Sequence, residues 1–396
     1  MLVLVAPGQG AQAPGFLKPW LDVPGVADRL TWWSAVADLD LIHYGTEADA
    51  ETIRDTAIAQ PLLVAAGLAA AVCVFPHPAD GFRLVGAAAG HSVGELTAAA
   101  GTGAISAESA MALVRERGRA MAAAAKLEET SMVAILGGDR DEVLAKLAEY
   151  DITPANINGA GQIVAAGTME QLAALAEDRP DGARVRPLAV AGAFHTEHMA
   201  PAVDRMRQLA KGVSTRDPRV RYLSNRDGQV VHSGREMIDR IVDQIANPVR
   251  WDLCMETMRD LGVTGILELP PAGTLTGLAK RALPGVETFA LKTPDDLDAA
   301  HAFVEKHGAV ANNPLNESPT WRLLVAPFGG TVKRGAAEPG HELAIGEVVG
   351  AITSRREEQS LTADHGGTVL EWLVEDGDPV SPGQPILRIH PTAQVH

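Results

Sequence analysis

The sequence predicts an α/β protein built on a mainly parallel sheet and followed by a small all-β domain. From residue 1 to about residue 291, short apolar runs alternate with longer Ala- and Leu-rich stretches, as expected of strands joined by helices. The C-terminal part instead contains short β-type runs between Gly and Pro turns. The length of 396 residues allows more than one domain of about 150 residues.

The α/β domain is expected to place its strands at the apolar runs that separate the helical stretches. These strands are 2–6, 84–88, 222–225 and 266–269, and the helices are 62–75, 93–101, 106–125, 196–210 and 275–283. The apolar run 62–75 is shorter than the roughly 18 to 20 residues that cross a bilayer. It is therefore predicted to be a buried helix.

Residues 127–191 are expected to form an α+β subdomain inserted into the α/β domain. Strands at 132–136, 162–166 and 185–190 alternate with helices at 141–150 and 169–177. This order suggests a ferredoxin-like fold. The α/β domain would then consist of residues 1–126 and 192–307.

A linker and a small domain are predicted at the C-terminal end. Residues 308–320 are polar, contain proline and show no periodicity, as is typical of a linker. In residues 321–396, the segment 326–332 (Ala-Pro-Phe-Gly-Gly-Thr-Val) recurs at 363–369 (Ala-Asp-His-Gly-Gly-Thr-Val). Two similar halves of short strands predict an all-β sandwich that neither half can close alone.

The composition excludes several classes of protein. Hydrophobic residues make up 46% and charged residues 21% of the chain, which is typical of a globular protein. The net charge is −16 without any Lys- and Arg-rich run, so nucleic-acid binding is not expected. Residues 1–7 lack the basic region of a signal or transit peptide, which predicts a cytoplasmic protein with no membrane partner. Cys73 and Cys254 lie among apolar residues without metal-ligand spacing, so no metal site is expected.

The candidate nucleophile is Ser92 in Gly90-His-Ser-Val-Gly94. The motif follows an apolar run and precedes a helical stretch, which is the context of a nucleophile elbow. Glycines permit the tight turn, and the first backbone amides of the helix favour an oxyanion. The alternative is a serine in an ordinary structural turn.

An activated serine needs a base, and His195 in Gly192-Ala-Phe-His is the candidate because it stands at a strand-to-helix junction. His195 could instead be an ordinary residue at a helix N-terminus, or it could form a metal site with His198. The metal reading is weak, since no third ligand is evident. His91 is expected to point away from Ser92 and to be structural.

Eight motifs together resemble the malonyl-CoA:acyl carrier protein transacylases of type II fatty-acid synthesis. They follow the family's order over roughly the first 300 residues, and the resemblance implies an α/β-hydrolase-like core with a ferredoxin-like insertion. The motifs are Pro-Gly-Gln-Gly-Ala-Gln at 7–12, Ala-Gln-Pro at 59–61, Gly-His-Ser-Val-Gly at 90–94, Val-Arg-Glu-Arg-Gly at 114–118, Asn-Ile-Asn-Gly-Ala-Gly-Gln at 156–162, Gly-Ala-Phe-His at 192–195, Asn-Pro-Val-Arg-Trp at 247–251 and Pro-Ala-Gly-Thr-Leu at 271–275.

The resemblance implies roles for the motif residues. Ser92 would take the malonyl group, and His195 would act as its base, oriented by a backbone carbonyl from residues 247–251. The backbone amides of Gln9 and Val93 would hold the oxyanion. Arg250 stands where several relatives carry Gln, and this departure affects the surroundings of His195.

Arg117 is expected to bind the substrate carboxylate. Spacing alone does not distinguish it from Arg115 and Arg119 or from a solvated helix face, but the family pattern, Arg followed by Gly118, selects it. A guanidinium can form two parallel hydrogen bonds with a carboxylate. Phe194 matches the malonyl-selective relatives, where a ring would crowd the extra methyl group of methylmalonyl. Such crowding would weaken binding by about 1 to 3 kcal/mol.

The implied function is malonyl transfer from malonyl-CoA to acyl carrier protein, without a cofactor. The alternative is a serine thioesterase or hydrolase of acyl-CoA, which the same site could run if water reached the acyl-enzyme. Acyl carrier protein would dock on a local basic patch, for which Lys280-Arg281 and the Arg184/Arg186 pair are candidates. A plain exposed helix face explains these residues equally well.

The C-terminal domain resembles biotinyl and lipoyl carrier domains. Those domains carry a lysine in the hairpin between their halves, but here Arg356 stands at that place, and Lys333 is the domain's only lysine. The resemblance therefore implies an unmodified domain without biotin or lipoate. Its expected role is docking, tethering or solubility.

Overall fold

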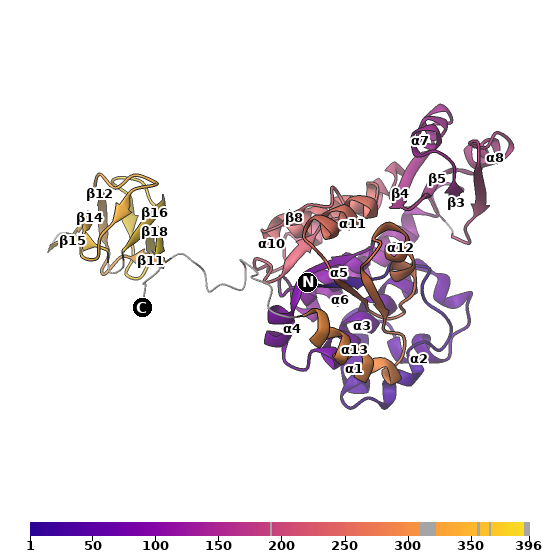
Figure 1. The fold of residues 1–396 in the computed structure, drawn as a ribbon, viewed down its shortest axis with the longest axis horizontal. Helices are drawn as coiled ribbons and strands as arrows, with labels where there is room; N and C mark the ends of the chain where they lie inside the picture. Colours follow the sequence, from indigo (N-terminus) through magenta and orange to yellow (C-terminus); the bar gives the residue numbers. More distant parts are fainter. Residues whose placement is uncertain (191, 309–321, 355–356, 364–365, 392–396) are drawn as a thin grey trace. The chain divides into compact units, whose positions relative to one another are not determined.

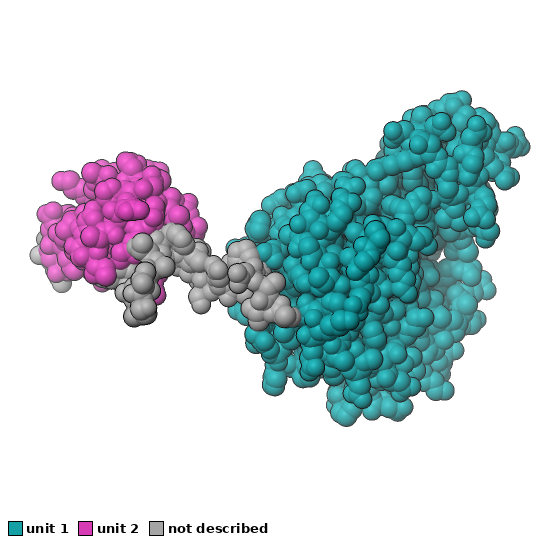
Figure 2. Space-filling model, in the orientation of Figure 1, with its two compact units in different colours: residues 1–313 teal, residues 314–396 magenta. Residues whose placement is uncertain are grey.

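The computed structural model describes residues 1–190, 192–308, 322–354, 357–363 and 366–391. The chain divides into two compact units, residues 1–313 and 314–396 (Figure 2). Most of the predicted linker 308–320 and the predicted hairpin residue Arg356 lie outside the described residues.

The larger unit is built on a six-stranded sheet in the order β10-β9-β1-β2-β7-β8. All neighbouring strands are parallel except β7 and β8, which confirms the predicted α/β class. The strands β8 and β10 were not predicted, because they are short and lie at the edges. The strands are β1 (Leu2–Ala6), β2 (Val85–Gly90), β7 (Arg221–Leu223), β8 (Val230–Val231), β9 (Gly265–Glu268) and β10 (Glu287–Ala290).

Helices cover both faces of this sheet. Alternate residues of β1 explain why, since Leu2 and Leu4 join one buried apolar cluster whereas Val3 and Val5 join another. The helices of this unit outside the subdomain are α1 (Val26–Ala37), α2 (Leu41–Thr46), α3 (Thr56–Val74), α4 (Pro78–Leu84), α5 (Gly94–Gly101), α6 (Ala107–Ala124), α9 (Ala200–Ala210), α10 (Gly234–Asp243), α11 (Trp251–Asp260), α12 (Thr274–Ala282) and α13 (Leu297–His307).

The helix α3 begins earlier than predicted. Asp55 caps its first turn by accepting a 2.8 Å hydrogen bond from the amide of Ala57, so the helix starts at Thr56 and includes Pro61. By length and mean hydropathy, 2.1, it could cross a membrane. However, 72% of the most apolar 18-residue stretch of this helix is buried inside the molecule. This is the pattern of a core helix, as the sequence predicts.

The subdomain projects from the rest of this unit and has its own sheet, in the order β4-β5-β3-β6, with all pairs antiparallel (Figure 1). The strand β4 was missed, because only Ala155 and Ile157 of its polar sequence are clearly apolar and inward-facing. The element order is β3 (Thr130–Gly137), α7 (Arg140–Glu149), β4 (Thr153–Gly159), β5 (Gln162–Thr168), α8 (Met169–Glu177) and β6 (Ala183–Pro187).

The smaller unit contains two four-stranded antiparallel sheets, in the orders β11-β18-β16-β13 and β15-β14-β12-β17. They enclose one apolar cluster that includes Val332, Val369, Val349 and Ile386, equivalent pairs of the internal repeat. The predicted all-β domain is therefore confirmed. Its strands are β11 (Arg322–Val325), β12 (Gly330–Arg334), β13 (Glu342–Leu343), β14 (Val348–Thr353), β15 (Glu358–Thr362), β16 (Gly367–Trp372), β17 (Pro379–Val380) and β18 (Pro385–Pro391).

Candidate active site

Ser92 stands on a sharp turn between β2 and α5. Its backbone φ is +53°, a left-handed conformation that is unfavourable for a residue with a side chain. The two flanking glycines allow this turn, because a Cβ at Gly90 would collide with the backbone of Gly94 and one at Gly94 with the carbonyl of Ala6. Asn225 Oδ1 holds the turn by accepting a 2.8 Å hydrogen bond from the amide of Ser92.

His195 contacts Ser92 directly. The Ser92 Oγ and His195 Nε2 atoms lie 2.8 Å apart, and His195 Nδ1 lies 2.8 Å from the backbone oxygen of Gln244. A carbonyl can only accept, so Nδ1 carries the proton and Nε2 is free to accept the serine proton. The 2.8 Å bond goes to Gln244, three residues before the predicted segment 247–251, while the backbone of Asn247, inside that segment, also favours the protonated form of His195 and so acts to raise its pKa.

Burial and the nearby Arg117 guanidinium lower the pKa of His195 to about 3. The imidazole is therefore neutral at ordinary pH, as a general base must be. His195 also has a positive φ of +63°, so both members of the pair occupy strained backbone positions. Such strain is typical of sites where the surrounding structure imposes the geometry.

His195 and His198 do not share a site. His198 Nδ1 lies 2.8 Å from Glu128 Oε2, whereas His195 contacts Ser92 and Gln244. In the described part of the chain, no group of three His, Cys, Asp or Glu side chains could hold a metal ion.

Arg117 lies fully buried beneath the nucleophile. Its Nη1 donates to Gln60 Oε1 over 2.7 Å, and its Nη2 donates to Gln244 Oε1 over 2.8 Å. Nη2 also lies 3.4 Å from Ser92 Oγ. A fixed cation therefore adjoins the atom that would carry an acyl group.

The solvated-face alternative for Arg117 is wrong. Arg115 and Arg119 occupy that role, because they lie nearer the surface and pair with Glu116 and Asp38. Burial lowers the pKa of Arg117 to about 10, while the Glu95 carboxylate favours its charged form. The guanidinium remains charged at neutral pH.

A small cavity of about 90 Å³ adjoins Ser92 and His195. A buried water molecule needs roughly 10 to 15 Å³ of such space, so the cavity has room for a small acyl group. Phe194, Gln9 and Val190 form part of its wall, and Met132, Asn156 and Val164 come from strands of the subdomain. The sequence did not predict that the subdomain contributes to this wall.

The backbone amides of Gln9 and Val93 lie on the two loops that flank the nucleophile. Within the described chain, neither amide donates a hydrogen bond, whereas the Gln9 side chain is fixed 3.3 Å from Thr56 Oγ1. The two loops approach closely, since a Cβ at Gly8 would lie 2.9 Å from the carbonyl oxygen of His91. Both amides therefore have no acceptor among the described residues, and unpaired amides of this kind are what an oxyanion requires.

Two neighbours of the pair have structural partners. His91 Nε2 lies 2.9 Å from Asn158 Oδ1, which gives the ring a structural partner, but His91 also lines the cavity with Ser92 and helps to lower the pKa of His195. Arg250 donates two 3.0 Å hydrogen bonds to the carboxylate of Asp252. The guanidinium of Arg250 is therefore occupied away from His195.

The predicted docking residues are exposed. Lys280 and Arg281 lie in the last turn of α12, and Arg184 and Arg186 lie on β6, the edge strand of the subdomain sheet. In the described residues, none of the four forms an ion pair.

Four polar residues around Arg117 and Ser92 were not predicted. Gln60 and Gln244 bind the guanidinium, and Glu95 and Asn225 lie behind Gln244. Weak signals existed: Gln60 belongs to the Ala-Gln-Pro motif and Glu95 directly follows Gly94. Neither position is unusual enough to show a function without the fold.

Comparisons with known proteins agree with this geometry. The family model described as "Acyl transferase domain" matches residues 3–297. A malonyl CoA-acyl carrier protein transacylase from Mycobacterium tuberculosis is 53% identical over 303 residues, 75% of this chain and 98% of that protein. The chain belongs to this transacylase family. The crystal structure of MCAT from Mycobacterium tuberculosis superposes on the transacylase with a TM-score of 0.73 at 52% identity, covering 76% of this chain and 99% of that chain.

A second solved relative was captured with a protein partner. The structure is of a type II PKS acyl-carrier protein in complex with its malonyl-transacylase. It matches this chain with a TM-score of 0.70 and 29% identity. It covers 76% of this chain and 99% of its own. The family model ends at residue 297, before the smaller β unit.

Proposed function

We propose that this transacylase moves the malonyl group from malonyl-CoA to the phosphopantetheine thiol of acyl carrier protein, in fatty-acid or polyketide synthesis. The observation that carries the proposal is the Ser92–His195 pair with the buried Arg117 guanidinium 3.4 Å from Ser92 Oγ. The similar malonyl CoA-acyl carrier protein transacylase and the solved complex with an acyl-carrier protein support the same substrate and partner.

The reaction would proceed in two similar halves. His195 Nε2 accepts the proton of Ser92 while Oγ attacks the thioester carbon of malonyl-CoA. The amides of Gln9 and Val93 stabilise the oxyanion, and the departing CoA thiolate takes the proton back from His195. The thiol of acyl carrier protein then repeats these steps on the malonyl-serine ester.

The malonyl group would be selected by charge and size. Arg117 pairs with the free carboxylate, which neutral acyl groups lack. Phe194 forms part of the wall of the 90 Å³ cavity, where an added methyl would cost about 1 to 3 kcal/mol. We therefore expect malonyl-CoA to be preferred over methylmalonyl-CoA.

The test separates transfer from hydrolysis, the alternative function. The protein is incubated with malonyl-CoA alone and with malonyl-CoA plus holo acyl carrier protein, and free malonate and malonyl-carrier are measured. We expect a stable malonyl-serine peptide without carrier and rapid transfer with carrier. Fast release of malonate without carrier would show a thioesterase instead.

The rate of serine acylation is expected to stay high in mild acid. Because the pKa of His195 is lowered to about 3, the base remains neutral from pH 7 down to pH 5. A histidine with an ordinary pKa of about 6.5 would be about 97% protonated at pH 5, with a roughly 30-fold loss of base. Acetyl-CoA is the suitable probe, since Arg117 has no acyl carboxylate to bind.

Mass spectrometry of the acetyl-enzyme at short times measures this rate, with the circular dichroism spectrum as a control for folding at pH 5. A decline centred near pH 6.5 would contradict a buried, neutral base.

The domain classification can also be proposed more finely. The β3-α7-β4-β5-α8-β6 order supports a ferredoxin-like subdomain at 127–191, inserted in an α/β-hydrolase-like core at 1–126 and 192–307. The paired four-stranded sheets and the internal repeat support a biotinyl- or lipoyl-like sandwich at 321–396. The segment 308–320 would be the linker.

We propose that the small unit is an unmodified docking or tethering domain, without biotin or lipoate. In the sequence, Arg356 stands where carrier domains have their lysine. An intact mass with a biotin or lipoyl adduct would refute this.

A further inference from the structure

Glu95 is a buried carboxylate that the proposed reaction does not use. It lies in the first turn of α5, three residues after Ser92, and is 1% exposed. Its Oε1 accepts a 2.7 Å hydrogen bond from the amide of Asn225, and its Oε2 accepts a 2.5 Å bond from Gln244 Nε2. Both carboxylate oxygens therefore face donors.

Gln244 connects Glu95 with the catalytic groups. Its Oε1 accepts from Arg117, and its Nε2 also lies 3.1 Å from both Ser92 O and Asn225 Oδ1. Its backbone oxygen accepts from His195. One residue therefore contacts the guanidinium, the backbone of the nucleophile and the base.

The direction of the Gln244 amide is decided by its partners. Arg117 has only donors, so the amide oxygen must face it, and the amide nitrogen must then face an acceptor. An ionised Glu95 offers only acceptors. A neutral amide at position 95 has one oxygen and one NH₂ group, so it could accept from Asn225 or from Gln244 but would turn its own donor toward the other. The conflict would favour rotation of the Gln244 amide, which would turn a donor toward Arg117.

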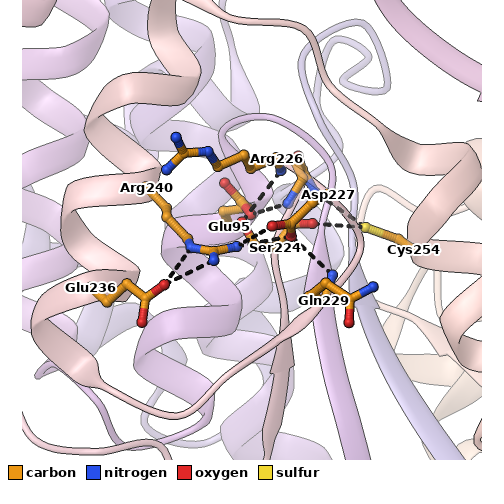
Figure 3. A network of polar contacts seen from close by, with 9 residues as sticks. Glu95, Ser224, Arg226, Asp227, Gln229, Glu236, Arg240 and Cys254 are labelled. Atoms are coloured by element: carbon orange, nitrogen blue, oxygen red, sulfur yellow. Dashed lines mark hydrogen bonds and ion pairs between the residues drawn. The ribbon is translucent and has the colours of Figure 1, made fainter.

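Charge also couples Glu95 to Arg117. Figure 3 shows Glu95 in a polar network, in which the cation Arg240 is already paired with Asp227 at 2.8 Å and with Glu236 at 2.8 Å. The Arg117 guanidinium favours the ionised form of Glu95. The titratable and charged groups facing Glu95 are Arg117 from α6, Tyr222 from β7 and Cys254 from α11.

We infer that Glu95 is a positioning residue for acyl selection: it fixes the amide of Gln244, which in turn aims Arg117 at the acyl group on Ser92. The inference rests on the proposed malonyl transfer and deepens it. Glu95 itself touches no substrate. Its removal should impair the choice of acyl group more than the chemistry at Ser92.

The test compares Glu95→Gln with the wild type for malonyl-CoA and acetyl-CoA. We expect the ratio of kcat/KM values, malonyl over acetyl, to fall at least tenfold, mainly through a higher KM for malonyl-CoA. Acylation by acetyl-CoA should stay within about threefold. Glu108→Gln, which removes an exposed carboxylate from the first turn of α6, should leave the ratio unchanged.

An unchanged or higher ratio in Glu95→Gln, or an equal loss with both substrates, would overturn the inference. If the wild type transferred no malonyl group, the proposed function would fail instead, so the two failures are distinguishable.

A second measurement needs no variant and covers the case of a Glu95→Gln protein that does not fold. Burial raises the pKa of Glu95 to about 7, so the carboxylate accepts from both donors above pH 7 and is protonated below it. The malonyl-over-acetyl ratio of the wild type should therefore fall as the pH is lowered through about 7. The titration of His195 and of the accepting thiol cancels in this ratio. A ratio that is constant from pH 5.5 to 8.5 would contradict the inference.

Discussion

Replacing Ser92 with alanine is expected to abolish acylation of the protein by malonyl-CoA. The variant lacks the only hydroxyl placed 2.8 Å from His195 Nε2 among the described contacts, so no acyl-enzyme can form. Loss of a nucleophile of this kind costs on the order of 10⁴- to 10⁶-fold in rate. Intact-mass spectrometry after brief exposure to malonyl-CoA, followed by a transfer assay with holo acyl carrier protein, measures both effects.

The matched control is Ser109→Ala, which removes a serine hydroxyl from the first turn of α6 whose hydrogen-bond partner among the described residues is Ser106 Oγ. It should keep the malonyl adduct and the transfer rate. A Ser92→Ala protein that still became acylated and transferred the group to its carrier would refute the proposed mechanism.

The second large effect is expected for Arg117→Lys. Gln60 and Gln244 accept from two different nitrogens of the guanidinium, and a single ammonium cannot reproduce this fork. The charge would shift relative to Ser92, and a misplacement of about 1 Å can cost about 100-fold. We expect kcat/KM for malonyl-CoA to fall by about 100-fold, whereas acylation by acetyl-CoA changes much less.

Arg119→Lys is the control for this substitution, because Arg119 lies on the same helix with an exposed side chain paired to Asp38. It should retain the malonyl preference. An Arg117→Lys protein with a wild-type preference would show that another group binds the carboxylate.

Local sequence was sufficient to locate the elbow and the central strands. The apolar run before Gly90, the two glycines and the helical stretch after them are contiguous, so their pattern is visible without the fold. The halves of the C-terminal unit were equally visible, since their glycines and apolar residues repeat. The choice of His195 and Arg117 depended on the family resemblance, because spacing left other candidates for each.

The remaining features depend on contacts between distant segments. The carbonyl that orients His195 comes from Gln244, 49 positions away, and Gln60 reaches Arg117 across 57 positions. No periodicity encodes such pairs. The strand β4 was missed for a related reason, since its partners lie elsewhere in the chain: the backbone of Ala155 and Ile157 bonds to Val249, and Asn158 contacts His91.

The origin of the cavity wall has a consequence for how this enzyme family can diversify. Ser92 and His195 lie before and after the subdomain in the sequence, whereas Met132, Asn156 and Val164 of the subdomain form part of the cavity wall. Substitutions in one gene segment can thus widen or narrow the accepted acyl unit while leaving the reacting pair untouched. The size of the accepted unit would change with this segment, whereas binding of its carboxylate would still depend on Arg117 in α6, beside the reacting pair.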